Sequence, residues 1–69
     1  MKLIISYFCS YTFKDKEIVV ENAAHIPRIG ETVTCEAIVN QRGNVYWPKL
    51  KVTGVEYDFN DGVAYVTLE

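Results

Sequence analysis

The sequence predicts an all-β protein that folds as a small, five-stranded, partly open barrel. Apolar residues recur at every second position in several short segments, as they do in strands with one buried face. Turn-forming Gly, Asn and Asp residues separate these segments. No window has the apolar spacing of a helix, beyond a single turn at residues 22–25. The 69 residues form one domain, residues 1–69.

The first expected strand is the longest. Its alternating apolar residues are Leu3, Ile5, Tyr7, Cys9, Tyr11 and Phe13. A strand over residues 3–13 would span about 40 Å at ~3.3 Å per residue, so this long N-terminal strand is expected to bend, or to break in the middle and serve two sheets. Residues 14–16 are expected to turn the chain, and residues 17–21 to return as a hairpin strand.

The middle of the chain begins with an irregular segment at residues 22–31, where Pro27 and Gly30 favour a turn. Residues 32–40 alternate again, which predicts a strand with its odd positions inward and Ile38 as the exception. The expected inward residues are Val33, Cys35, Ala37 and Val39. Residues 41–44 then form a hairpin tip around Gly43.

Two further strands complete the barrel. Leu50 and Val52 are expected inward, but the phase then slips at Gly54, as at a β-bulge, so that Val55, Tyr57 and Phe59 take over. Residues 60–62 are a tight turn and residues 63–68 the last strand. Either Val63 and Tyr65 or Ala64, Val66 and Leu68 must face outward there, and the pattern leaves both options open.

Composition and sequence pattern limit the cellular compartment and the cofactors to be expected. No apolar run reaches the length of a membrane span, and the N-terminal segment alternates unlike a signal peptide, so we expect a cytoplasmic protein. Cys9 and Cys35 are expected to be buried free thiols rather than a disulfide, although their separation is open. With one histidine they cannot form a four-ligand zinc site, and no cofactor or metal is expected.

No catalytic constellation is present in the sequence. His25 lies in an irregular segment without a nucleophile motif, which favours a surface histidine over a general base. Asp58, Asn60 and Asp61 lack the ligand pattern of a calcium loop and are better explained as turn residues. Neither a glycine-rich phosphate loop nor a small-molecule substrate site is identified. We therefore expect that the protein is not an enzyme.

A cluster of aromatic and basic residues suggests one binding function. Aromatic rings flanked by cations suit single-stranded nucleic acid, because rings stack on bases and cations contact phosphates. The candidate residues are Arg42, Tyr46, Trp47, Lys49 and Lys51. Two simpler explanations stay open: lysines protect strand edges, and Trp47 caps the barrel. The net charge of −2 counts against non-specific nucleic-acid binding.

Apolar residues on expected outward positions suggest a second binding function. Phe8 and Ile4 interrupt the polar side of the first strand, and Tyr65 is a candidate on the last. Such residues indicate a protein interface, with a partner or with a second copy as a homodimer, unless a bent strand turns them inward. Arg28 and Glu31 form a solvated pair across their turn or lie on the rim of this interface.

The order "PRIGETV", "LKVTGVEYDF", "NDG" and "VAYVTL" resembles small SH3-like barrels over residues 26–68. An OB-fold is disfavoured because no room exists for its inserted helix. The pattern is also similar to short uncharacterised proteins of bacteriophages and mobile elements, in which "PRxGE" precedes the middle strands. This resemblance implies an SH3-like fold and a phage-type accessory protein or inhibitor of a host defence protein. It implies no activity, and no active-site residue is carried over.

Together these observations predict a non-enzymatic interaction module that works by protein–protein contact. The alternative is a single-stranded nucleic-acid-binding barrel centred on Trp47.

Overall fold

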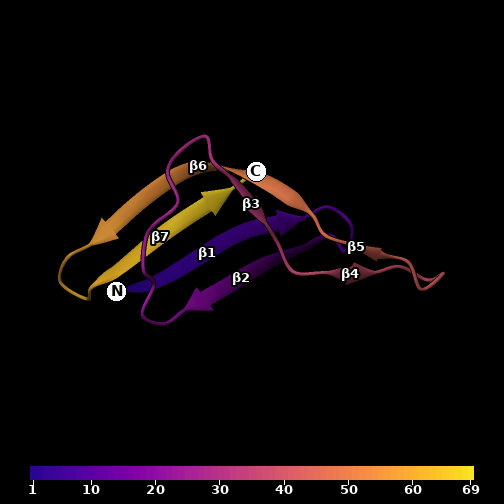
Figure 1. The fold of residues 1–69 in the computed structure, drawn as a ribbon, viewed down its shortest axis with the longest axis horizontal. Helices are drawn as coiled ribbons and strands as arrows, with labels where there is room; N and C mark the ends of the chain where they lie inside the picture. Colours follow the sequence, from indigo (N-terminus) through magenta and orange to yellow (C-terminus); the bar gives the residue numbers. More distant parts are fainter.

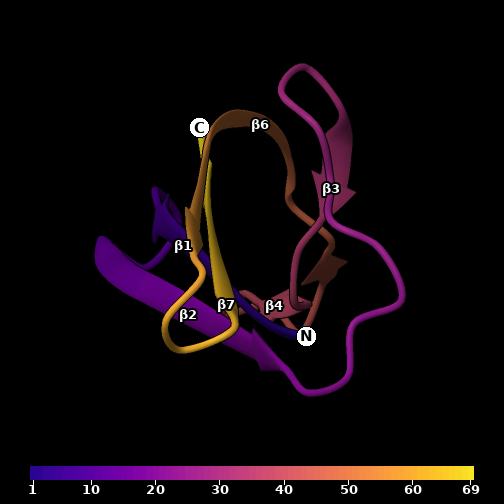
Figure 2. The same cartoon turned by 90° about the vertical axis from the view of Figure 1, so that its left-hand side faces the viewer.

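The computed structural model describes all of residues 1–69 and contains seven strands and no helix. Five strands form one sheet in the order β2-β1-β7-β6-β3, which curls into a half-barrel, and β4 pairs with β5 in a hairpin at one end (Figures 1 and 2). The strands are β1 (Lys2–Cys9), β2 (Lys14–Val20), β3 (Thr32–Thr34), β4 (Ile38–Val39), β5 (Val45–Tyr46), β6 (Lys49–Asp58) and β7 (Val63–Leu68). The all-β prediction is confirmed.

The core lies on the concave side of the curled sheet and comes mainly from its two central strands. On β1 the predicted alternation is confirmed, because Leu3, Ile5, Tyr7 and Cys9 are all buried. On β7 the even residues Ala64, Val66 and Leu68 are buried, whereas Tyr65 is exposed. Tyr65 therefore faces outward as one of the two options had it, but Val63, the other residue of that option, is buried at 8% exposure.

The prediction of a long, bent N-terminal strand is wrong. β1 ends at Cys9, and residues 10–13 form the turn, so Tyr11 and Phe13 are exposed rather than inward. Residues 14–16 belong to β2, which pairs with β1 so that Ile18 lies opposite Ile5. A turn centred on residue 15 would have put Ile18 opposite Thr12, on the polar side. Burial of Ile18 therefore favours the earlier turn.

The middle strand is also interrupted, contrary to prediction. β3 and β4 are separated at residues 35–37, where the Cys35 N–H donates to the Pro48 carbonyl at 2.7 Å. The face of the chain changes at this break, so Ile38 packs against the core while Ala37 and Val39 are exposed. The hairpin tip around Gly43, which has a positive φ of 82°, is confirmed.

The β-bulge expected near Gly54 is confirmed, because the pairing of β6 with β7 shifts between Val52 and Gly54. Val55 then packs against the core as predicted. Tyr57 and Phe59 do not: Tyr57 is still paired with Ala64 of β7 but 49% exposed, and it stacks on Phe59, the residue after β6, with 6.0 Å between ring centroids. The tight turn that follows closes through Gly62, which has a positive φ of 66°.

Two long-range features could not be anticipated from the pattern. β1 and β7 pair in parallel, with Ile5 opposite Val66. The irregular segment at residues 21–31 crosses the open side of the half-barrel (Figure 1), and its Ala23 and Ile26 pack against the core. It is tied down at β6, because Gly30 N–H donates to the Val52 carbonyl at 2.9 Å. No helical turn forms at residues 22–25.

Candidate interaction surface

The convex side of the sheet, which we call the outer face, is built from alternate residues of β2, β1, β7 and β6. Register places Val19, Ile4, Tyr65 and Glu56 in one row across these strands. The next row holds Glu17, Ser6, Thr67 and Gly54. Asp15 and Phe8 pair in the row after that, where Glu69 is joined to Lys51 by reciprocal backbone hydrogen bonds.

The outer face carries an apolar row that no other element covers. Val19 is 48% exposed and Tyr65 39%, with half-buried Ile4 between them. Phe8, at 54% exposure, lies two rows further along β1. Cross-strand neighbours on one face are close enough to act as one contact surface. The predicted interface residues Phe8 and Tyr65 are therefore brought to the same face, and Val19 joins them.

The outer face is strongly acidic. Its carboxylates are Asp15, Glu17, Glu21, Glu56, Asp58 and Glu69, against Lys2 and Lys51. Lys2 is already paired with Glu21, at 4.0 Å between the ammonium nitrogen and a carboxylate oxygen. The face thus has a formal charge of −4 in a chain of net charge −2, so the rest of the molecule is net basic. Charge is segregated between two sides of the protein.

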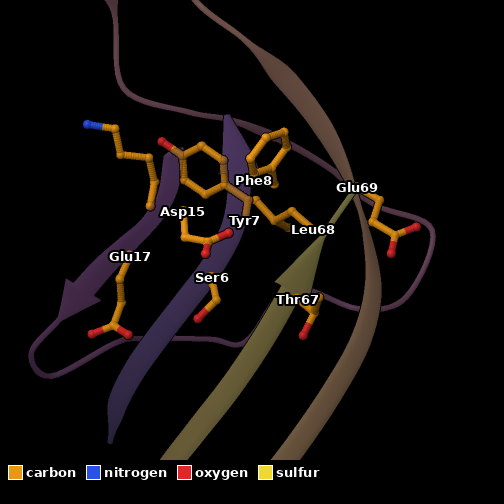
Figure 3. Close-up of a pocket in the computed structure, with 9 residues that line it drawn as sticks. Ser6, Tyr7, Phe8, Asp15, Glu17, Thr67, Leu68 and Glu69 are labelled. Atoms are coloured by element: carbon orange, nitrogen blue, oxygen red, sulfur yellow. The ribbon is translucent and has the colours of Figure 1, made fainter. Parts of the chain in front are cut away.

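An open groove of about 480 Å³ lies in the acidic part of this face (Figure 3). Side chains from β1, β2 and β7 and the residue after β7 surround it, namely Ser6, Phe8, Asp15, Glu17, Thr67 and Glu69. Lys16 is the one cation among the residues that line it, against three carboxylates. Figure 3 shows Ser6 between Glu17 and Thr67, with the Phe8 ring further along the same strand. Carboxylates and hydroxyls around an aromatic ring suit a cationic side chain with an apolar stem.

Exposed aromatic residues lie where the β1–β2 turn meets the β4–β5 hairpin. We call this region the aromatic end. Tyr11 stacks on Tyr46 with 5.9 Å between ring centroids and 11° between planes. Trp47 is 61% exposed and Phe13 is 79% exposed. Phe13 also has a positive φ of 54°, a conformation that bulky residues rarely adopt. The strained backbone thus leaves the phenylalanine ring in water, where it gains no packing within the chain.

The hairpin that presents Tyr46 is organised by one side chain. The Asn40 carboxamide oxygen accepts hydrogen bonds from the backbone N–H groups of Arg42 and Asn44, each at 2.9 Å. The Asn40 amide nitrogen lies 3.3 Å from the Tyr46 hydroxyl. Basic residues are near this end in the sequence, because Arg42 is in the hairpin tip, Lys49 is two residues after Trp47 and Lys14 follows Phe13. Of the predicted set, Arg42, Tyr46, Trp47 and Lys49 lie in or beside the β4–β5 hairpin, whereas Lys51 lies opposite Glu69.

A smaller cleft of about 270 Å³ opens at the inner side of the same end and is lined by Tyr7, Cys9, Lys16 and Glu36, among others. Burial raises the pKa of the Cys35 thiol, with further contributions from the charges of Cys9 and Glu36. A hydrogen bond from Thr12 lowers the pKa of Cys9, and nearby Lys16 adds to the shift. Both thiols are free and buried, as expected. No nucleophile–base pair is assembled in this cleft.

The phenol of Tyr7 makes stability pH-dependent. Burial raises its pKa above 10.0, with smaller contributions from the negative charges of Cys35 and Glu36. Because the unfolded phenol ionises first, this contribution is intact below pH 10.0 and is lost as the pH rises through the higher folded pKa. The raised pKa of Cys35 also lowers stability as the pH rises above 9.0, whereas the lowered pKa of Cys9 has the opposite effect on stability.

We therefore expect the free energy of unfolding to fall from about pH 9 to 11, and to fall less in Tyr7→Phe. Urea unfolding at several alkaline pH values, followed by circular dichroism, measures both slopes. Equal slopes for the two proteins would show that Tyr7 does not contribute.

Arg28 and Glu31 have a structural role at their turn. The Glu31 carboxylate accepts a hydrogen bond from the Arg28 backbone N–H, and the Glu31 N–H donates to the Arg28 carbonyl at 3.0 Å. The two residues are thus joined across the turn in an exposed setting, but through the Arg28 backbone, because no ion pair joins their side chains. Neither residue lines the groove of the outer face.

Other functional chemistry has little support in this fold. No group of three or more His, Cys, Asp or Glu side chains gathers closely enough to hold a metal ion. Asp58 instead accepts backbone hydrogen bonds from Asn60 and Asp61, as predicted for turn residues. No helix of the length and apolar character needed to cross a membrane is present.

Sequence reasoning missed Val19, Asp15 and Glu17 on the outer face and Phe13 at the aromatic end. The signal for the first three was the alternation of basic and acidic residues over 14–17 followed by the apolar residues 18–20, which the expected turn at residues 14–16 concealed. Phe13 was missed because it continued the apolar alternation of β1 past its end.

Comparisons of this chain with protein-family models, with curated proteins and with solved structures find no match. The candidate surfaces must therefore be interpreted from their own chemistry.

Proposed function

We propose that this protein is a non-enzymatic interaction module whose outer face binds a basic region of a protein partner. The observation that carries the proposal is the exposed apolar row of Val19, Ile4 and Tyr65 beside a groove lined by carboxylates. Exposed aromatic and aliphatic side chains provide the anchors that dominate binding energy in protein interfaces. The surplus of carboxylates selects a cationic partner and repels acidic ones.

The setting of this module is part of the proposal. The curled sheet and the bulge in β6 support an SH3-like barrel, and two buried free thiols suit the reducing cytoplasm. An inhibitor of a host defence protein, the role implied by the phage-type resemblance, would act through stoichiometric binding at this same face. Such a role needs no catalytic group.

The test is affinity capture with matched variants. Immobilised protein is exposed to lysate of the organism that encodes it, beside Tyr65→Asp and Phe8→Asp. We expect a captured protein with a basic surface, and a loss of affinity of about 30-fold or more for each variant when that protein is purified and titrated. Ile29→Asp, at a site 68% exposed away from the groove, serves as the control and should bind normally. Capture that is indifferent to Tyr65 and Phe8 would contradict the proposal.

The aromatic end supports a second candidate, the binding of single-stranded nucleic acid. Its specific support is the exposure of Trp47 and Phe13, the Tyr11–Tyr46 stack and the nearby Arg42 and Lys49. Free ring faces can stack on bases while the cations contact phosphates. The acidic outer face would be turned away from the nucleic acid in such a complex.

An oligothymidine of about ten nucleotides is a suitable probe, because sequence-independent stacking needs no particular base. Binding should quench the fluorescence of Trp47, the single tryptophan, and weaken steeply with salt. Trp47→Ala combined with Lys49→Glu should abolish it, whereas Tyr65→Asp should not. Absence of any fluorescence change at low salt would exclude this candidate.

A further inference from the structure

The edge of the five-stranded sheet is open along β2. This strand ends the sheet order, and none of the backbone hydrogen bonds made by loops involves residues 14–20. Figure 1 shows β2 at the lower margin of the sheet, with β1 on its other side. Its seven residues therefore leave one row of backbone donors and acceptors unpaired.

The side chains of β2 divide by charge between the two faces. Asp15 and Glu17 lie opposite Phe8 and Ser6 and so project from the outer face. Lys14 and Lys16 lie opposite Cys9 and Tyr7 and project from the inner face. Beyond them, Ile18, Val19 and Val20 make the end of the strand apolar on both faces. The edge thus carries acids on one side, lysines on the other, and an apolar end.

This arrangement disfavours pairing of β2 with a second copy of itself. Antiparallel strands related by a twofold axis keep each face continuous, so a residue can lie opposite only residues of its own face. The register that pairs all of β2 puts Glu17 opposite Glu17 of the other copy. Moving this register by one residue pair toward the β1–β2 turn puts Lys16 opposite Lys16 and Asp15 opposite Glu17. Moving the register by one pair toward Val20 puts Glu17 and Lys16 opposite valines and Asp15 opposite Glu21. Like charges directly opposite destabilise a strand pair.

We propose that β2 instead receives an extended segment of a protein partner, which adds antiparallel to the sheet. Its residues opposite Asp15 and Glu17 are Lys or Arg, those opposite Lys14 and Lys16 are acidic, and those opposite residues 18–20 are apolar. Backbone hydrogen bonds supply affinity in this mode of recognition, and alternating side chains supply specificity. The inference rests on the proposed function, because it names the partner element that reaches the acidic face.

The position of the groove favours an extended, basic partner segment at the β2 edge. Asp15 and Glu17 line the groove as well as the edge. A strand added beyond β2 continues the outer face, so its basic side chains lie beside these carboxylates. Val19, 48% exposed at the same edge, gains an apolar neighbour. One partner segment can therefore satisfy the charged and apolar parts of the edge together.

Two peptides of identical composition test the inference. The complementary peptide is Val-Val-Ile-Lys-Glu-Lys-Glu, which in antiparallel alignment places lysines opposite Glu17 and Asp15. Its isomer is Val-Val-Ile-Glu-Lys-Glu-Lys, which places like charges opposite each other at all four positions. Both are acetylated, amidated and fluorescently labelled, and their binding to the full chain is measured by anisotropy. Amide shifts in NMR spectra locate the site.

We expect the complementary peptide to bind about ten-fold or more tightly than the isomer, because four cross-strand pairs change sign. Amide shifts should concentrate on residues 14–20. The double variant Asp15→Lys, Glu17→Lys should lose most of this preference, because each peptide then meets two matched and two repelled charges. Glu56→Lys, on the same face but away from the edge, should retain it.

Equal binding of the two peptides, or shifts centred on β7 instead of β2, would overturn the inference. The proposed function is judged separately by Tyr65→Asp. If the peptide preference holds while Tyr65→Asp leaves capture of a natural partner unchanged, the edge binds strands and the outer-face proposal fails. If Tyr65→Asp abolishes capture while neither peptide discriminates, the outer face binds and strand addition is wrong.

Discussion

Leu68→Ala is expected to remove a large part of the free energy of unfolding of this small domain. Leu68 is 2% exposed and is one of the three largest fully buried side chains of the core. It lies on β7 between Tyr7 of β1 and Val52 of β6, so the cavity left by its removal is enclosed by neighbouring strands. Such a truncation destabilises by about 2 to 5 kcal/mol. A domain of this length has about 3 to 10 kcal/mol in total.

Urea unfolding followed by circular dichroism measures this loss as a lower midpoint. Ile29→Ala is the matched control, since it removes the same number of carbon atoms from a side chain that is 68% exposed. It should change the free energy of unfolding by less than about 0.5 kcal/mol. If both variants unfold at the same urea concentration, the assignment of Leu68 to the core is incorrect.

Ile26→Asp is expected to uncover the open side of the half-barrel. Ile26 lies in the irregular segment and packs against the core at the place where no strand closes the curled sheet. An aspartate there loses the apolar contact and brings a carboxylate against the core, which costs about 2 to 3 kcal/mol. The segment should detach locally, so binding of an apolar dye such as ANS should rise while the far-ultraviolet circular dichroism changes little.

The control for this segment is Ile29→Asp, three residues further along the same loop. It introduces the same carboxylate at an exposed position and should leave dye binding and stability unchanged. A rise in dye binding in both variants would mean that the loop as a whole, and not the contact of Ile26, covers the core.

Local patterns correctly predicted the parts of the fold that depend on neighbouring residues. Alternation identified the inward face of β1, and the break in alternation located the bulge at Gly54. Glycines located the hairpin tip at Gly43 and the turn at Gly62, because these positions have positive φ. Each of these features is set by a side chain's own geometry or by its nearest neighbours along the chain.

The candidate surface was predictable only in part. Phe8 stood out because it interrupts the polar positions of a clear strand, and it does project from the outer face. Asp15 and Glu17 could not be placed, since a turn at residues 14–16 and a turn at residues 10–13 both agree with local composition. The choice depends on whether Ile18 meets Ile5 across the sheet, which is a long-range contact.

By itself the sequence determined the all-β class, the inward face of β1, the bulge in β6 and the turns at Gly43 and Gly62, because alternation and turn chemistry act over a few residues. Only the tertiary structure decided where the first hairpin turns, which side of β7 faces water, and that β1 and β7 pair in parallel. It also decided that acidic residues of β2 and β6, and the glutamates that follow β2 and β7, share one face. The physical reason is that the face of a sheet is assembled by register between strands, and register is selected by burial of the whole core.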